Sequence, residues 1–279
     1  MTSKYKYQIA NDGAPVVALH SSASGSTQWL SLQALLQDRF DVIALDLPGY
    51  DLARPRDDAF ADMSSLACPI IADIEGMAFP VHLVGHSFGG AVALKIALLR
   101  PELVKSLTLY EPVAFHLLNC GEQSEQWSLT GVQTVEQTLN TAMAAGCDEF
   151  GMAEFIDFWQ GTGTWQGLQP ALREKLVAAA PMVSSDFRCI YGETWTLDDL
   201  AGLQIPTLIM MGMDSPEVSQ RLATMIALNL PGAEFAMLPG LGHMAPINAP
   251  EWVNPRIHQH IARIETSVAH VRWPVRRAA

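Results

Sequence analysis

Short apolar runs alternate with longer amphipathic segments along most of the chain. The runs are rich in Val, Ile and Leu and do not alternate apolar with polar positions. Continuous apolar runs predict strands that are covered on both faces, as in a parallel sheet. The predicted strands are residues 15–20, 42–47, 81–85, 104–110, 207–211 and 233–238.

Helix-like segments separate these runs, over residues 28–37, 63–75, 89–99 and 216–230. The alternation predicts an α/β fold with a doubly wound, mostly parallel sheet. It breaks between about residues 113 and 200, where the pattern is helical and aromatic residues are frequent. We therefore expect a core from residues 1–112 and 201–279, with residues 113–200 inserted as a helical cap (lid) over the sheet.

Composition excludes several classes of protein. The 279 residues are 49% hydrophobic and carry a formal net charge of −12, with no basic cluster before the tail at 271–279. We therefore expect no nucleic-acid partner. The chain shows neither an apolar signal segment nor a run of about 18 apolar residues, so we expect a cytoplasmic protein without a membrane partner.

Cysteine usage adds no metal or redox chemistry. The four cysteines are widely spaced and form no C-x-x-C pair. We expect no metal and no cofactor, and the partner we expect is a small-molecule substrate. A homodimer is left open.

The stretch VHLVGHSFGG, residues 81–90, places Ser87 where a buried strand passes into a helix. A turn this tight crowds the positions two residues to each side, and Gly85 and Gly89 occupy them without Cβ atoms. The pattern predicts a nucleophile elbow that lifts the serine hydroxyl above the sheet edge. A plain glycine turn with an incidental serine is the alternative.

A serine hydroxyl needs a base to accept its proton, and His243 is the best candidate. It follows the last apolar run in a glycine-rich loop, where such sheets present reactive groups. The other histidines lie within strands, in the expected cap or near the C-terminus, apart from His86, which adjoins the serine.

The imidazole in turn needs an acid to orient it, and two carboxylates are candidates. Asp214 follows the strand at 207–211, and Glu111 follows the strand at 104–110. We prefer Asp214 and keep Glu111 as the alternative acid. Asp214 also has an ordinary structural reading, because Asp-Ser-Pro is a good sequence for a helix start.

An oxyanion hole requires at least two donors. The backbone N–H of Phe88, directly after the nucleophile, is one candidate. The loop after the first strand reads His20-Ser21-Ser22 and supplies the other. We expect Ser22 to be the donor, with Ser21 as the second choice.

Together these residues resemble the α/β-hydrolase family. The segments that carry the resemblance are VVALHSSASGSTQW, VIALDLPGYDLARP, VHLVGHSFGGAVAL, PTLIMMGMDSP and LPGLGHMAPINAPEWVN, spread from about residue 16 to 264. The resemblance implies a triad of Ser87, Asp214 and His243, and an oxyanion hole from Ser22 and Phe88. The family often has His-Gly where this chain has His20-Ser21.

We expect a cofactor-independent serine hydrolase that cleaves a small or medium apolar carboxylic ester through an acyl-enzyme on Ser87. Lactone, thioester or carbon–carbon (β-diketone) hydrolysis would use the same residues, as would haloperoxidase or perhydrolase chemistry. A non-catalytic ligand receptor with a hydrolase fold is the alternative from another class.

Overall fold

The computed structural model describes residues 14–50, 62–77, 80–120 and 123–271, and the arginines of the C-terminal tail lie outside them. A six-stranded sheet forms its centre, in the order β2-β1-β3-β4-β5-β6, with parallel pairing between all neighbours. The strands are β1 (Val16–Leu19), β2 (Val42–Leu45), β3 (Val81–His86), β4 (Val104–Tyr110), β5 (Thr207–Gly212) and β6 (Glu234–Leu238). The predicted doubly wound parallel sheet is confirmed, with every predicted strand present.

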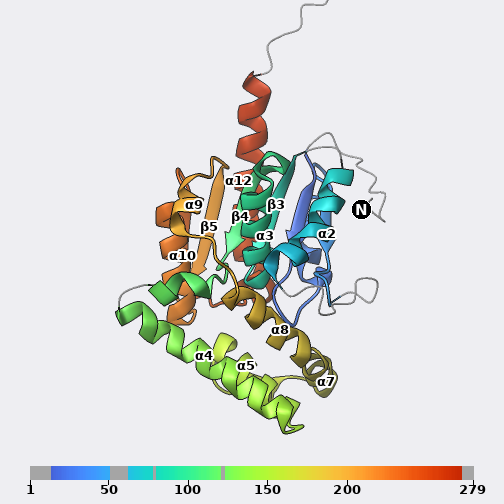
Figure 1. The fold of residues 1–279 in the computed structure, drawn as a ribbon. Coiled ribbons are helices and arrows are strands. Elements are labelled where there is room, and N and C mark those ends of the chain that lie inside the picture. The colour runs from blue at the N-terminus through green and yellow to red at the C-terminus, as the bar shows by residue number, and fades with distance from the viewer. Residues whose placement is uncertain (1–13, 51–61, 78–79, 121–122, 272–279) are drawn as a thin grey trace, which may run out of the picture.

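Helices cover both faces of this sheet (Figure 1). They are η1 (Ser26–Trp29), α1 (Leu30–Leu36), α2 (Met63–Gly76), α3 (Phe88–Leu99), η3 (Pro101–Leu103), α10 (Glu217–Asn229), α11 (Ala245–Asn248) and α12 (Pro250–Val271). Within the described residues, no helix is long and apolar enough to cross a membrane.

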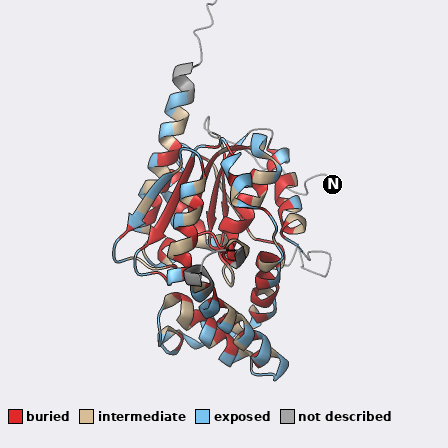
Figure 2. Cartoon of the chain, turned by 60° about the vertical axis from the view of Figure 1, so that its left-hand side comes forward, coloured by how far each residue is buried: buried red, intermediate tan, exposed pale blue. Residues whose placement is uncertain are grey.

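Alternate strand residues supply two separate cores. In β1, Val17 and Leu19 belong to the cluster that includes apolar residues of α2, α3 and α10, whereas Val16 and Ala18 belong to the cluster with α1 and α12. Successive side chains of a strand point to opposite faces, so a continuous apolar run fits a sheet covered on both sides. Figure 2 shows that the inner strands, β1, β3, β4 and β5, are almost entirely buried.

Between β4 and β5 the described chain contains helices and no strand. These helices are η4 (Phe115–Cys120), α4 (Gln123–Ala144), α5 (Asp148–Gln160), α6 (Thr164–Gly167), α7 (Pro170–Ala178), α8 (Ala180–Tyr191) and α9 (Leu197–Ala201). Helices α4, α5, α7 and α8 lie together beyond one end of the sheet, at the bottom of Figure 1. We call these four helices the cap helices; α9 lies apart from them and packs on α10.

Candidate active site

Ser87 lies at the sharp turn from β3 into α3. Its backbone has φ 54° and ψ −117°, which is a strained conformation for a residue with a side chain. The turn is possible because its neighbours are glycines: a Cβ on Gly85 would lie 2.6 Å from the carbonyl oxygen of Gly89, and a Cβ on Gly89 would lie 2.4 Å from that of Leu19. The geometry is that of the predicted elbow.

His243 lies against this serine, as expected from the sequence. Its Nε2 is 2.9 Å from the Ser87 Oγ, and both residues are buried. On the other side of the ring, Nδ1 is 2.6 Å from Oε2 of Glu111. The carboxylate can only accept, so Nδ1 carries the proton and Nε2 is left to accept the serine proton.

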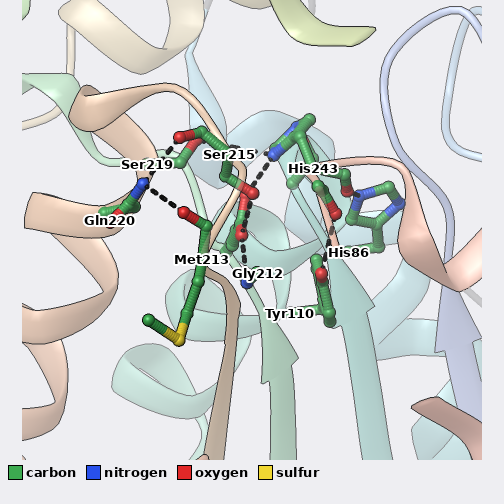
Figure 3. Close-up of polar contacts among 11 residues, drawn as sticks. His86, Tyr110, Gly212, Met213, Ser215, Ser219, Gln220 and His243 are labelled. Carbon is green, nitrogen blue, oxygen red and sulfur yellow. Dashed lines mark hydrogen bonds and ion pairs between the residues drawn. The ribbon is translucent and has the colours of Figure 1, made fainter. Parts of the chain in front are cut away.

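The structure therefore places Glu111, and not the preferred Asp214, in contact with the imidazole. Glu111 follows β4, is 1% exposed and has a φ of 45°. Its other oxygen, Oε1, accepts hydrogen bonds from Gly212 N–H at 2.7 Å and from Ser215 Oγ at 2.5 Å. The contacts of Gly212, Ser215 and His243 are drawn in Figure 3.

Asp214 is exposed, whereas Glu111 is buried against the imidazole. The Asp214 N–H donates to the carbonyl of Leu241 at 2.9 Å, which ties this turn to the loop before His243. Gly212 makes the close approach possible, since a Cβ there would lie 2.2 Å from the Leu241 oxygen. The expected contact between Asp214 and His243 is therefore wrong for this structure.

The loop after β1 lies beside Ser87. Ser21 N–H donates to Gln28 Oε1 at 3.2 Å, so this amide already has a partner. Ser21 and Ser22 both line the same cavity as Ser87, and the Ser22 hydroxyl donates to Asp186 Oδ2 at 2.6 Å, which leaves the Ser22 backbone amide to face the cavity. These contacts favour Ser22 over Ser21 as the loop residue that faces a reacting group.

His20, at the base of this loop, is an uncharged ring that donates one hydrogen bond and accepts another. Its Nδ1 donates to the Ser21 carbonyl at 2.7 Å and its Nε2 accepts from Leu47 N–H at 3.0 Å. Burial lowers the pKa of His20 to about 4, so the ring is uncharged at neutral pH. The pair of hydrogen bonds holds the end of β1 to the segment after β2.

A cavity of about 350 Å³ opens between Ser87 and the cap helices. Its walls are mainly apolar, with aromatic rings from Phe115, Phe155, Trp159 and Phe187. Two other aromatic residues of the expected cap, Trp127 and Phe150, are exposed instead. This volume lies at the lower end of the range for small-molecule sites.

A sequence model described as the Alpha/beta hydrolase family matches residues 16–256. The chain belongs to the α/β-hydrolase family. It is a hydrolase, as are its named hydrolase relatives. In the described part of the chain, no group of His, Cys, Asp and Glu side chains is arranged to hold a metal ion.

Relatives of this α/β-hydrolase include enzymes that act on different bonds. It is 23% identical to (E)-2-((N-methylformamido)methylene)succinate hydrolase of Acinetobacter baylyi, over 89% of this chain and 90% of that protein. Among solved structures it resembles a thermophilic esterase from Thermogutta terrifontis, with a TM-score of 0.73, 21% identity, and 92% and 93% of the two chains covered. It also resembles carboxylesterase CesB from Bacillus subtilis, with a TM-score of 0.70, 20% identity, and 91% and 86% covered. At these identities the solved structures show the shared fold.

The structure of this α/β-hydrolase adds two residues that sequence reasoning did not select. His86 Nε2 donates to the carbonyl of His243 at 2.8 Å, and the Tyr110 hydroxyl donates to that of Gly242 at 2.8 Å (Figure 3). Burial, and then the charge of His243, lowers the pKa of His86 well below its ordinary value. Burial, and then the charge of Glu111, raises the pKa of Tyr110, so its hydroxyl stays protonated.

These two donors stand directly before Ser87 and Glu111 in the sequence. Each strand end therefore supplies one candidate reacting or orienting residue and one neighbour that holds the loop of His243. The only sequence signal was this adjacency, because the partner atoms are carbonyls of a loop more than a hundred residues away.

Proposed function

We propose that this protein is a serine hydrolase that cleaves a small or medium apolar carboxylic ester. One observation carries the proposal: an unbroken, buried hydrogen-bond chain runs from Ser87 Oγ through His243 to Glu111 Oε2, with distances of 2.9 and 2.6 Å. A nucleophile, a base and an orienting acid in this order activate a serine for attack on a carbonyl.

The chemistry follows from these contacts. Ser87 Oγ forms a bond to the carbonyl carbon of the ester while its proton passes to His243 Nε2. The C–O bond to the leaving alcohol then breaks, and the alcohol takes that proton. Water adds to the acyl-enzyme in the same way and releases the carboxylic acid. Glu111 accepts the hydrogen bond from His243 Nδ1–H and stabilises the imidazolium that forms in each half-reaction.

The oxyanion that forms in both steps needs donors placed in advance. We assign this role to the backbone amides of Phe88, in the first turn of α3, and of Ser22. The positive end of the α3 dipole adds to the stabilisation, because Ser87 occupies the N-cap position of that helix.

The cavity supports an apolar acyl compound as substrate. Its aromatic and aliphatic walls are suited to hydrocarbon, and its volume of about 350 Å³ suits a small or medium molecule. Trp159 of α5 also packs over the His243 ring, with centroids 4.3 Å apart, and shields it from water. Esterases are among the solved proteins with this fold.

The test combines active-site labelling with a substrate panel. Wild type should react rapidly with a fluorophosphonate probe and hydrolyse p-nitrophenyl esters, whereas Ser87→Ala should do neither and keep its melting temperature. Absence of labelling in the wild type would favour a non-catalytic receptor. Faster turnover of a lactone, a thioester or a β-diketone acid would move the assignment to that bond, and peroxide-dependent halogenation would indicate a haloperoxidase.

A further inference from the structure

Strain at the active site has a third location besides Ser87 and Glu111. In the part of the chain that the structure describes, the non-glycine residues with positive φ are Ala23 (55°), Ser87 (54°) and Glu111 (45°). Such conformations persist only where surrounding contacts hold them in place. Ala23 directly follows Ser22, so the strained turn belongs to the loop that we assign to the oxyanion hole.

A short hydrogen-bond network holds this turn. Ala23 N–H donates to the Tyr50 hydroxyl at 3.0 Å, and the Tyr50 hydroxyl donates to Asp186 Oδ2 at 2.7 Å. The Ser22 hydroxyl donates to the same oxygen at 2.6 Å. One carboxylate oxygen therefore fixes Ser22 directly and Ala23 through one intermediary.

Asp186 does not belong to the sheet or its loops. It lies on α8, one of the cap helices that cover the end of the sheet in Figure 1, and it is 1% exposed. Burying a carboxylate is costly unless strong hydrogen bonds compensate, and an apolar residue would serve cap packing better. A buried acid that holds Ser22 directly and Ala23 through Tyr50 is explained by the loop that it orients.

We propose that Asp186 is a positioning residue that holds the oxyanion loop from the cap. The cap then does more than cover the substrate, because a docked α8 sets the direction of the Ser22 amide. This inference rests on the proposed serine-hydrolase function. It predicts that loss of the Asp186 contact weakens binding of the transition state more than binding of the substrate.

Two variants isolate the contact. Asp186→Ala removes the carboxylate oxygen that accepts from Ser22 and Tyr50, and Ser22→Ala removes the hydroxyl but keeps the backbone amide. The matched control is Glu193→Ala. Glu193 follows α8 and pairs with Lys95 of α3 at 2.9 Å, with side chains 6% and 14% exposed, so it is another contact, partly buried, between the inserted segment and the core.

Three quantities are measured for each variant: kcat and KM for a p-nitrophenyl ester, the inhibition constant of an alkyl boronic acid, and that of a non-hydrolysable ether analogue. The boronic acid forms a tetrahedral anion on the serine, whereas the ether resembles the ground state. Asp186→Ala and Ser22→Ala should lower kcat and boronate affinity by about 10- to 100-fold. Ether affinity should stay within about threefold, and Glu193→Ala should change all three quantities by no more than that.

Unchanged boronate affinity in Asp186→Ala would overturn the proposal, as would an equal loss in Glu193→Ala, which would make Asp186 an ordinary cap contact. If Asp186→Ala does not fold, Ser22→Ala alone decides between the outcomes. Failure of the proposed function looks different: the wild type itself would then neither react with a fluorophosphonate nor hydrolyse esters, and the positioning role would fall with it.

Discussion

Replacing Glu111 with glutamine should convert His243 to the wrong tautomer. Oε1 of Glu111 accepts from both Gly212 N–H and Ser215 Oγ, so a glutamine at this position keeps its carbonyl oxygen there. Its NH₂ group then faces His243 Nδ1 in place of Oε2. An amide donor at Nδ1 requires that nitrogen to accept, which moves the ring proton to Nε2, where it blocks proton transfer from Ser87.

The expected loss of activity is large, because a His243 ring with its proton on Nε2 cannot accept the proton of Ser87. The positions of the active-site residues should not change. A wrong tautomer in a serine–histidine–acid triad lowers kcat by about 10⁴-fold, which corresponds to about 5 kcal/mol of transition-state stabilisation. KM should change little, since Glu111 lies behind the imidazole and is not part of the cavity lining. Glu111→Asp keeps the charge but opens a gap of about 1.5 Å, and should recover part of the activity.

The assay is steady-state hydrolysis of a p-nitrophenyl ester, together with the rate of fluorophosphonate labelling. Asp214→Asn is the matched control, because it removes a carboxylate that is exposed and does not touch the ring. It should retain kcat within about threefold. The reasoning is refuted if Asp214→Asn loses activity by orders of magnitude while Glu111→Gln stays within about tenfold of wild type.

Three further predictions concern stability and the cap. Gly89→Ala should cost about 3 kcal/mol or more in urea unfolding, because its Cβ would lie 2.4 Å from the carbonyl oxygens of Leu19 and His20; an unchanged midpoint would contradict this. The unfolded chain protonates His20 below about pH 6.5 and the folded chain only near pH 4, so this residue alone should contribute a fall of about 3 kcal/mol in stability as pH drops through that window. The variant His20→Gln should show a shallower fall, and an equal slope would argue against a buried neutral ring. Trp159→Ala should lower kcat/KM by about tenfold and Trp159→Phe by less, because the ring over His243 keeps water away; equal values for both variants would exclude that role.

Local sequence was enough to predict the sheet and the elbow. Strands read from apolar runs appear as β1 to β6, and the predicted helices appear as α1, α2, α3 and α10 with ends shifted by a residue or two, the first preceded by η1. Burial on both faces leaves a continuous apolar signal, and the Ser87 turn leaves glycines on both sides. The sheet and the elbow depend on residues that are close together in the sequence, so local sequence patterns predict both.

The acid could not be chosen in this way. Asp214 and Glu111 follow β5 and β4, which are neighbours in the sheet, so both emerge at the same edge near His243. The choice depends on the end of β5 and the turn after it, where Gly212 and Ser215 bind the Glu111 carboxylate while Asp214 stays exposed. No local sequence pattern predicts which of two carboxylates on neighbouring strands will contact the imidazole.

By itself, then, the sequence determined the parallel sheet, the elbow at Ser87 and the loop that carries His243. Only the tertiary structure decided that Glu111 orients the imidazole and that Asp186 reaches from the cap to the loop of Ser22. The physical reason is distance along the chain: backbone periodicity and steric limits act between near neighbours. A hydrogen bond across more than a hundred residues exists only after packing brings its two atoms together.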